Sequence, residues 1–148
     1  MATTSRTELP ALASKLRVSV ARTARRLRQE GGGGLSPSQI AALNTLDRCG
    51  ALTPSEIARH ERIQRPTATR LIGRLEEQGL LARTRDPEDG RSSVIALTPA
   101  GRAVVAEQRT RKDAFLEERL RRLRPEDRAA LDRAAELLER LLSDEAPA

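Results

Sequence analysis

The stretch from Leu52 to Gly101 limits the possible folds of this chain more than any other part of the sequence. It contains two helix starts, at Thr53 and at Thr98, where a hydroxyl can accept from the first free amides and a proline follows at the first helical position. Between them lie a second helical pattern and two short β-compatible runs joined by a turn. The order helix, helix, β-ribbon, helix predicts a winged helix-turn-helix.

Apolar periodicity and turn residues divide the rest of the chain into further helices. The predicted fold class is mainly α with a small β-ribbon, and helices flank the winged region on both sides. The predicted elements are helices over 9–30, 36–49, 54–60, 65–78, 99–123 and from Pro125 onward, with strands over 80–85 and 92–97. Four glycines, residues 31–34, end the first helix and connect it to the second. The 148 residues are one protomer at the usual domain size.

Charge points to a polyanionic partner. The chain has 27 Lys and Arg against 21 Asp and Glu, a net charge of +6, and arginine strongly outnumbers lysine. Guanidinium groups bind phosphates and guanine edges in a planar, bidentate geometry. Aromatic residues make up 1% of the chain, which argues against a single-strand binder that stacks bases on aromatic rings. Duplex DNA is therefore the expected partner.

The helix over residues 65–78 carries the expected major-groove contacts. Its apolar residues lie on one stripe, and the opposite face and its flanks present polar and cationic side chains. These candidate DNA-binding residues are Arg65, Pro66, Thr67, Thr69, Arg70 and Arg74. Arginine can reach guanine O6 and N7 or a phosphate, and threonine can contact bases, thymine methyl groups or phosphate. A solvated basic face on an ordinary helix is the alternative interpretation.

The turn between the two predicted strands carries a second candidate contact. Asp89 and Arg91 stand two residues apart at its tip. That spacing lets a carboxylate orient a guanidinium toward a narrow, electronegative minor groove. An incidental, exposed ion pair on an Asp-Gly hairpin is the alternative.

Three motifs together resemble the MarR family of bacterial transcriptional regulators. They are residues 76–83 (EEQGLLAR), residues 86–91 (DPEDGR) and residues 97–102 (LTPAGR). The resemblance implies a homodimer of winged helix-turn-helix protomers bound to a pseudo-palindromic operator in double-stranded DNA. It further implies dimerisation helices over 8–34 and 99–148, a DNA-binding lobe over 36–98, and a small aromatic or anionic ligand that controls affinity.

The remaining chemistry of the sequence is sparse. One cysteine and one histidine leave no metal-binding cluster, and no nucleophile-base set or cofactor motif is present, so we expect no metal, no cofactor and no enzyme activity. Cys49 is expected to be a buried thiol, and His60 to make a structural hydrogen bond. Without a signal peptide or an apolar run of about 20 residues, the expected location is cytoplasmic.

The sequence therefore predicts a homodimeric, sequence-specific regulator of transcription, with repression released by a small molecule as the favoured mode. Two alternatives stay open. A winged helix can serve as a protein-protein interaction module, in which case the basic helix would dock on an acidic partner. A basic protein of this kind can also bind DNA without sequence preference.

Overall fold

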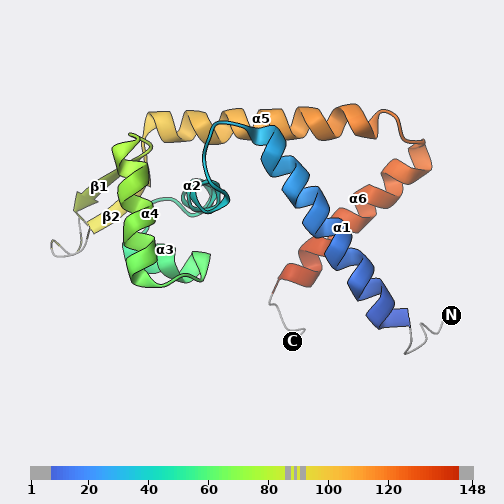
Figure 1. Ribbon diagram of the computed structural model, residues 1–148, viewed down its shortest axis with the longest axis horizontal. Coiled ribbons are helices and arrows are strands. Elements are labelled where there is room, and N and C mark those ends of the chain that lie inside the picture. The colour runs from blue at the N-terminus through green and yellow to red at the C-terminus, as the bar shows by residue number, and fades with distance from the viewer. Residues whose placement is uncertain (1–7, 86–87, 89, 91–92, 144–148) are drawn as a thin grey trace. The chain divides into compact units, whose positions relative to one another are not determined.

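The computed structural model of the chain describes residues 8–85, 88, 90 and 93–143 (Figure 1). Within these residues it contains six helices and one two-stranded sheet, in the order that the sequence predicts. The helices are α1 (Glu8–Gly31), α2 (Pro37–Cys49), α3 (Pro54–Glu61), α4 (Arg65–Glu77), α5 (Pro99–Leu120) and α6 (Pro125–Leu142), and the strands are β1 (Leu81–Arg85) and β2 (Ser93–Leu97). The predicted fold class is confirmed.

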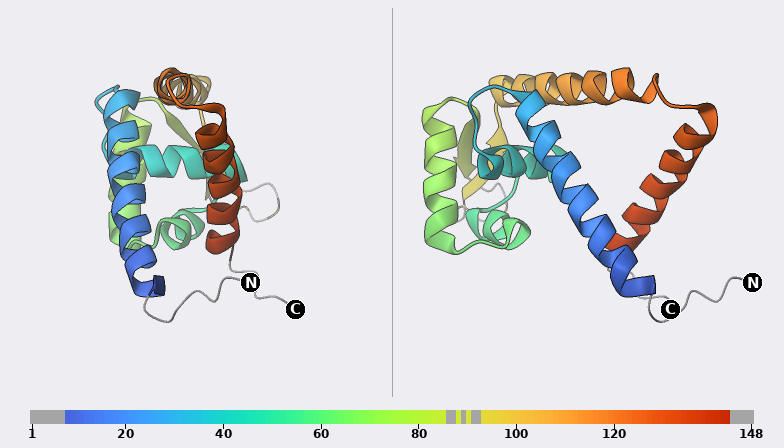
Figure 2. Two further views of the ribbon diagram at one scale, coloured as in Figure 1. Left: turned by 90° about the vertical axis from the view of Figure 1, so that its right-hand side faces the viewer. Right: turned by 45° about the vertical axis from the view of Figure 1, so that its right-hand side comes forward.

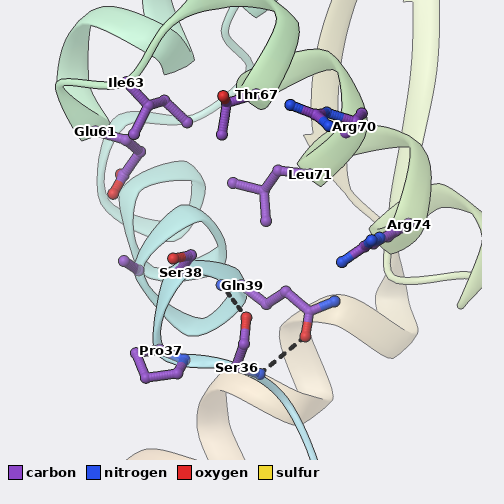
Figure 3. A pocket seen from close by; sticks show the side chains of 11 residues that line it. Ser36, Pro37, Ser38, Gln39, Glu61, Ile63, Thr67, Arg70, Leu71 and Arg74 are labelled. Atoms are coloured by element: carbon purple, nitrogen blue, oxygen red, sulfur yellow. Dashed lines mark hydrogen bonds between the residues drawn. The ribbon is translucent and has the colours of Figure 1, made fainter.

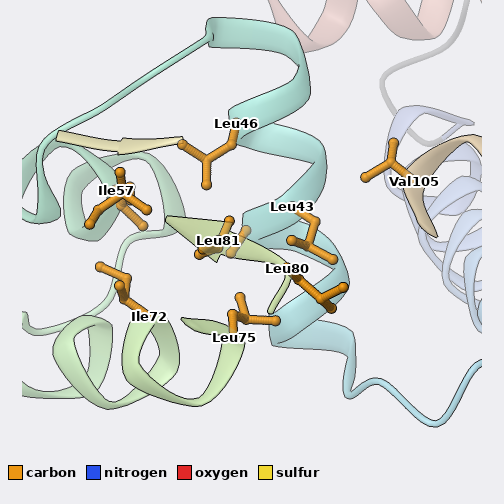
Figure 4. Close-up of a cluster of buried hydrophobic side chains, with 10 residues drawn as sticks. Leu43, Leu46, Ile57, Ile72, Leu75, Leu80, Leu81 and Val105 are labelled. Carbon is orange, nitrogen blue, oxygen red and sulfur yellow. The ribbon is translucent and has the colours of Figure 1, made fainter. Parts of the chain in front are cut away.

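Helices α2, α3 and α4 and the β-ribbon enclose one hydrophobic core (Figure 4). Its largest fully buried side chains are Leu43, Ile57, Ile72, Leu75 and Ile95, so every one of these elements except β1 contributes at least one. β1 and β2 pair antiparallel, with Leu81 opposite Leu97. An isolated bridge from Leu52 to Ile95 ties the segment before α3 to the ribbon.

Complete capping boxes begin α2 and α3. At Ser36 and at Thr53 the side-chain hydroxyl accepts from the amide three residues on, and the side chain of that third residue accepts from the cap's own amide. Glu56 is the reciprocal partner of Thr53, at 2.8 Å. The Thr53 amide that donates to this carboxylate lowers the pKa of Glu56 from its usual value of 4.5. These two starts match the capping signals in the sequence.

The start of α5 depends on a close backbone approach. The Thr98 hydroxyl accepts from the Gly101 amide at 3.0 Å and donates to the carbonyl of Gly79. A Cβ atom added to Gly101 would lie 2.1 Å from the Leu80 carbonyl oxygen, well inside van der Waals contact. Only glycine therefore fits at this crossing of α5 and the chain entering β1.

The four-glycine segment ends α1 and is held against α5. Gly32, Gly33 and Gly34 all have positive φ, which glycine adopts without steric cost. The carbonyl of Gly31 accepts from Arg111, and that of Gly32 accepts from Gln108. The predicted helix stop is confirmed, and side chains of α5 bind the backbone of the connector.

The chain forms two compact units, Met1–Lys112 and Asp113–Ala148. In the first, α4 packs against α3 and β1 (Figure 2). The second contains the end of α5 and the whole of α6, and α6 has no buried residue. Leucines of α6 are exposed instead, with Leu141 at 71% and Leu142 at 77%.

Candidate nucleic-acid interface

Helix α4 separates its apolar and polar residues as the sequence predicts. Ala68, Ile72 and Leu75 are buried against the core. All six predicted contact residues of this helix are exposed: Arg65, Pro66, Thr67, Thr69, Arg70 and Arg74. The core thus fixes the helix from one side and leaves a cationic face on the other.

The arginines of this region are not neutralised by neighbouring acids. The side chains of Arg65, Arg70 and Arg74 form no salt bridge or hydrogen bond with any residue that the structure describes. Two nearby carboxylates have other partners, because Glu61 accepts from the Thr45 hydroxyl and Glu76 pairs with Arg83 at 2.9 Å. The guanidinium groups on α4 are therefore available to an external anion.

Two small residues shape the same face. The Thr69 hydroxyl donates to the Arg65 carbonyl at 3.0 Å, so the helix backbone already satisfies its proton. Gly73 lies beside Arg70 and Arg74, and a Cβ atom added there would meet nothing within 4 Å. Packing inside the chain therefore gives no reason for a glycine at this position, although glycine costs a helix about 1 kcal/mol relative to alanine.

A pocket of about 530 Å³ lies between α4 and the first turn of α2 (Figure 3). Thr67, Arg70 and Arg74 line its α4 side, and Leu71 projects into the middle of it. Ser36 and Ser38 line the opposite side. The pocket thus joins the apolar side chain of Leu71 to two cations of the exposed face, while the Glu61 carboxylate, which accepts from Thr45, also lines it. Apolar periodicity places Leu71 in the core stripe and gives no signal of this pocket.

The β-ribbon packs against α4 through β1. β1 and β2 pair in register, and all of β1 after Leu81 is exposed, including Arg85. The predicted wing contacts Asp89 and Arg91 lie outside the described residues. Winged-helix proteins bind duplex DNA with this arrangement of an exposed cationic helix next to a β-ribbon.

Comparison with known proteins decides the family. The MarR family model matches residues 35–93. An HTH-type transcriptional regulator of Mycobacterium leprae is 38% identical over 137 residues, which cover 92% of this chain and 95% of the relative. This chain belongs to the MarR family. It is a DNA-binding transcriptional regulator, and the family is not one of enzymes.

Solved structures agree with this assignment. A MarR family protein from Bacillus stearothermophilus superposes with a TM-score of 0.83 at 25% identity, covering 95% of this chain and 99% of the other. BpsR of Bordetella bronchiseptica superposes with a TM-score of 0.62 at 26% identity, covering 87% and 98% of the two chains. The DNA binding of BpsR is regulated by 6-hydroxynicotinic acid.

Two expectations about this MarR-family chain were wrong. Cys49 is exposed although it follows the buried stripe of Thr45 and Leu46, and it is the last residue of α2. His60 is exposed as well and has no hydrogen-bond partner among the described residues. Both residues lie near helix ends, where periodicity alone poorly predicts which side faces solvent.

The described part of the chain gives no sign of a metal site or of a membrane span. No group of three or more His, Cys, Asp or Glu side chains there is arranged to hold a metal ion. None of the helices described has both the length and the hydropathy that crossing a bilayer requires.

Proposed function

We propose that this protein is a homodimeric repressor that recognises a pseudo-palindromic operator in double-stranded DNA and is released by a small molecule. The carrying observation is the exposed face of α4, where arginines without acidic partners among the described residues stand next to Gly73. A cationic helix face with room for close backbone approach fits the major groove. Steric occlusion of a promoter by the bound dimer is the mode of repression.

Each predicted site residue has a role in this proposal. Arg70 and Arg74 lie one helical turn apart and read guanine edges, while Thr67 and Thr69 offer methyl and hydroxyl groups to bases or phosphates. Arg65 and Pro66 lie at the N-terminal end of α4, the end that enters the groove first in this class of fold. Asp89 and Arg91 extend the contact into the minor groove.

The exposed apolar side chains of the terminal helices support the homodimer. In α1 the only buried residue is Gly31, and α6 has none. The exposed large apolar residues of these helices are Leu9, Leu12, Leu16, Val18, Val20, Leu131, Leu137, Leu141 and Leu142. A protein rarely leaves so many leucines in water without a partner. The helices over 8–34 and 99–148 are therefore the proposed dimerisation helices, and residues 36–98 the DNA-binding lobe.

The pocket between α2 and α4 supports control by a ligand. Its cations, Arg70 and Arg74, belong to the proposed DNA-binding face. An aromatic or otherwise apolar anion held there would compete with DNA for both guanidinium groups. Because such a ligand binds only the DNA-free state, it would lower the operator affinity by mass action.

The test compares binding to duplex DNA from the gene's own upstream region with binding to a scrambled duplex of equal length, across a salt series. The proposal expects at least a tenfold preference for the upstream duplex near physiological salt, and release on adding an aromatic carboxylate. Equal, steeply salt-dependent binding to both would indicate a nonspecific DNA-binding protein. Binding to neither would favour a protein-protein interaction module.

The dimer is tested separately by sedimentation velocity. Leu141→Asp places a charge on a side chain that is 71% exposed in the single chain, so the protomer should keep its fold. The proposal expects the variant to sediment as a monomer and to lose operator binding. Unchanged sedimentation would exclude this part of α6 from the interface.

A further inference from the structure

The turn between α3 and α4 contains an unusual backbone conformation. Arg62 ends α3 with φ 53° and ψ 44°, in the left-handed region, and its amide donates to the carbonyls of Ala58 and Arg59. It is the only described non-glycine residue with positive φ. The other described residues with positive φ are Gly32, Gly33, Gly34, Gly50 and Gly79.

Glycine is the residue that this conformation favours, because an L side chain is strained there. The same chain places glycine where α1, α2 and α4 give way to positive φ, but places arginine at the end of α3. Strain that is retained in this way points to a use for the side chain. A role for the side chain must explain why this position has arginine, with its long cationic side chain, and not glycine.

Contacts within the described part of the chain do not explain Arg62. Its side chain is exposed, and it forms no hydrogen bond or salt bridge with any described residue. The hydrogen bonds that close the turn come from its backbone and would survive replacement by glycine. The side chain is therefore available to a partner outside the described residues.

The position of Arg62 limits what that partner can be. It precedes Arg65, the first residue of α4, by three residues, so the two Cα atoms are at most about 11 Å apart. The major groove is about 12 Å wide and is bordered on both sides by phosphates. When the N-terminal end of α4 enters the groove, Arg62 lies within reach of its edge.

We propose that Arg62 binds a backbone phosphate at the edge of the major groove and thereby fixes the depth and register of α4. This inference rests on the proposed binding of duplex DNA by α4. A phosphate contact positions the helix and carries no sequence information, so its removal should weaken binding to all duplexes alike. The backbone strain at Arg62 is then retained for DNA binding at the expense of stability.

Three variants separate charge from backbone strain. Arg62→Gly removes both, Arg62→Asn removes the charge but tolerates the left-handed conformation, and Arg62→Lys keeps the charge. Arg48→Gln is the matched control, because Arg48 is an exposed arginine at the end of α2 without a described salt bridge and belongs neither to the proposed contact face nor to the proposed dimerisation helices. Arg70→Ala reports whether α4 binds DNA at all.

We expect Arg62→Gly to raise the Tm by about 2–5 °C, as relief of strain outweighs the entropy that glycine adds to the unfolded chain. Arg62→Gly and Arg62→Asn should weaken binding to both upstream and scrambled duplexes about 3–10-fold at about 0.15 M salt. The slope of log K against log salt should become shallower by about 0.9 for each phosphate that the variant no longer neutralises. Arg62→Lys and Arg48→Gln should bind nearly as the parent protein does.

Several results would overturn the inference. If Arg70→Ala loses affinity while Arg62→Asn keeps it, Arg62 does not contact DNA, although the proposed function stands. A loss of affinity confined to the upstream duplex would make Arg62 a base-reading residue instead. A fall in Tm for Arg62→Gly would give the side chain a structural role. If the parent protein itself binds no duplex, the proposed function fails first, and the Tm result still tests the strain.

Discussion

Arginines are abundant both in the region from α3 to α4 and in the region from α5 to α6, yet their partners differ. From α5 to α6 several of them pair with acids three or four residues away, as in Arg111 with Glu107, Arg121 with Glu117 and Arg133 with Glu136. From α3 to α4, no arginine forms a salt bridge with a described residue. The same side chain thus supports a helix in one region and remains available to an external anion in the other.

The difference arises from what the acids do. In α5 and α6 they face solvent at helical spacing, where the only competitor for an arginine is water. Around α3 and α4 three of the acids are engaged by the fold, since Glu56 caps α3, Glu61 accepts from Thr45, and Glu76 reaches Arg83 on β1. A high net charge therefore indicates a binding face only where the structure also removes the local counter-charges.

The largest effect is expected from the arginines of α4. Arg70→Ala or Arg74→Ala should reduce discrimination between upstream and scrambled duplex by about 1–3 kcal/mol if the residue reads a base. Fluorescence anisotropy at fixed salt concentration measures this discrimination. Arg121→Ala is the control, because Arg121 is already paired with an acid. Equal reductions in affinity for both duplexes would assign the arginine to a phosphate instead.

A smaller effect, on stability, is expected from releasing the Glu56 carboxylate from its capping box with Thr53. Thr53→Ala breaks the capping box and should lower the free energy of unfolding by about 1 kcal/mol in urea titrations. The same substitution frees Glu56 to approach Arg59 one helical turn away. If stability is unchanged, the capping box makes no net contribution to the stability of α3.

The pH dependence checks the same capping box. Since the pKa of Glu56 is lower in the folded chain than its usual 4.5, its contribution is present above that value and is lost as the pH falls through the folded pKa. Glu56→Gln should flatten the dependence of unfolding free energy on pH below about 4.5. An unchanged pH profile would contradict this assignment.

Gly73→Ala should move stability and binding in opposite directions. Alanine adds about 0.5–1 kcal/mol to the stability of α4, because the position is open and glycine weakens a helix. The added methyl group should weaken operator binding if the backbone of α4 approaches DNA here. Thermal unfolding and anisotropy on the same preparation measure both. Unchanged affinity would exclude close approach at Gly73.

The smallest effect is expected from the arginines between α5 and α6 that pair with nearby acids. Arg121→Ala removes an exposed pair with Glu117 at i,i+4 spacing, which contributes about 0.3–0.5 kcal/mol at low salt. DNA affinity should stay within about twofold of the parent, because an exposed pair of this kind is already neutralised locally. A much larger drop in affinity would show that pairing with an acid does not prevent an arginine from binding DNA, and would break the comparison.

Most of the fold was predictable because its signals are local. The capping residues Ser36, Thr53 and Thr98 predict the starts of three helices. In each case the side-chain hydroxyl accepts from the amide three residues on, as predicted. The apolar stripe of α4 likewise placed all six candidate contacts on its exposed side. Local spacing sets both features, so no tertiary information was needed.

The predictions that failed depend on distant parts of the chain. The exposure of Cys49 and His60 follows from how α2 and α3 pack, which periodicity near a helix end does not specify. The need for glycine at Gly101 comes from the Leu80 carbonyl, 21 residues earlier, which only the fold brings close.

Periodicity, caps and charge were sufficient to predict the order of the elements and the cationic face of α4, and three short motifs carried the family resemblance, because these depend on neighbours within a few residues. Packing gave Glu61 and Glu76 their partners, placed Arg62 in a left-handed conformation and formed the pocket beside Arg70. These features join residues from different elements, and their geometry arises only when the shared core brings those elements together.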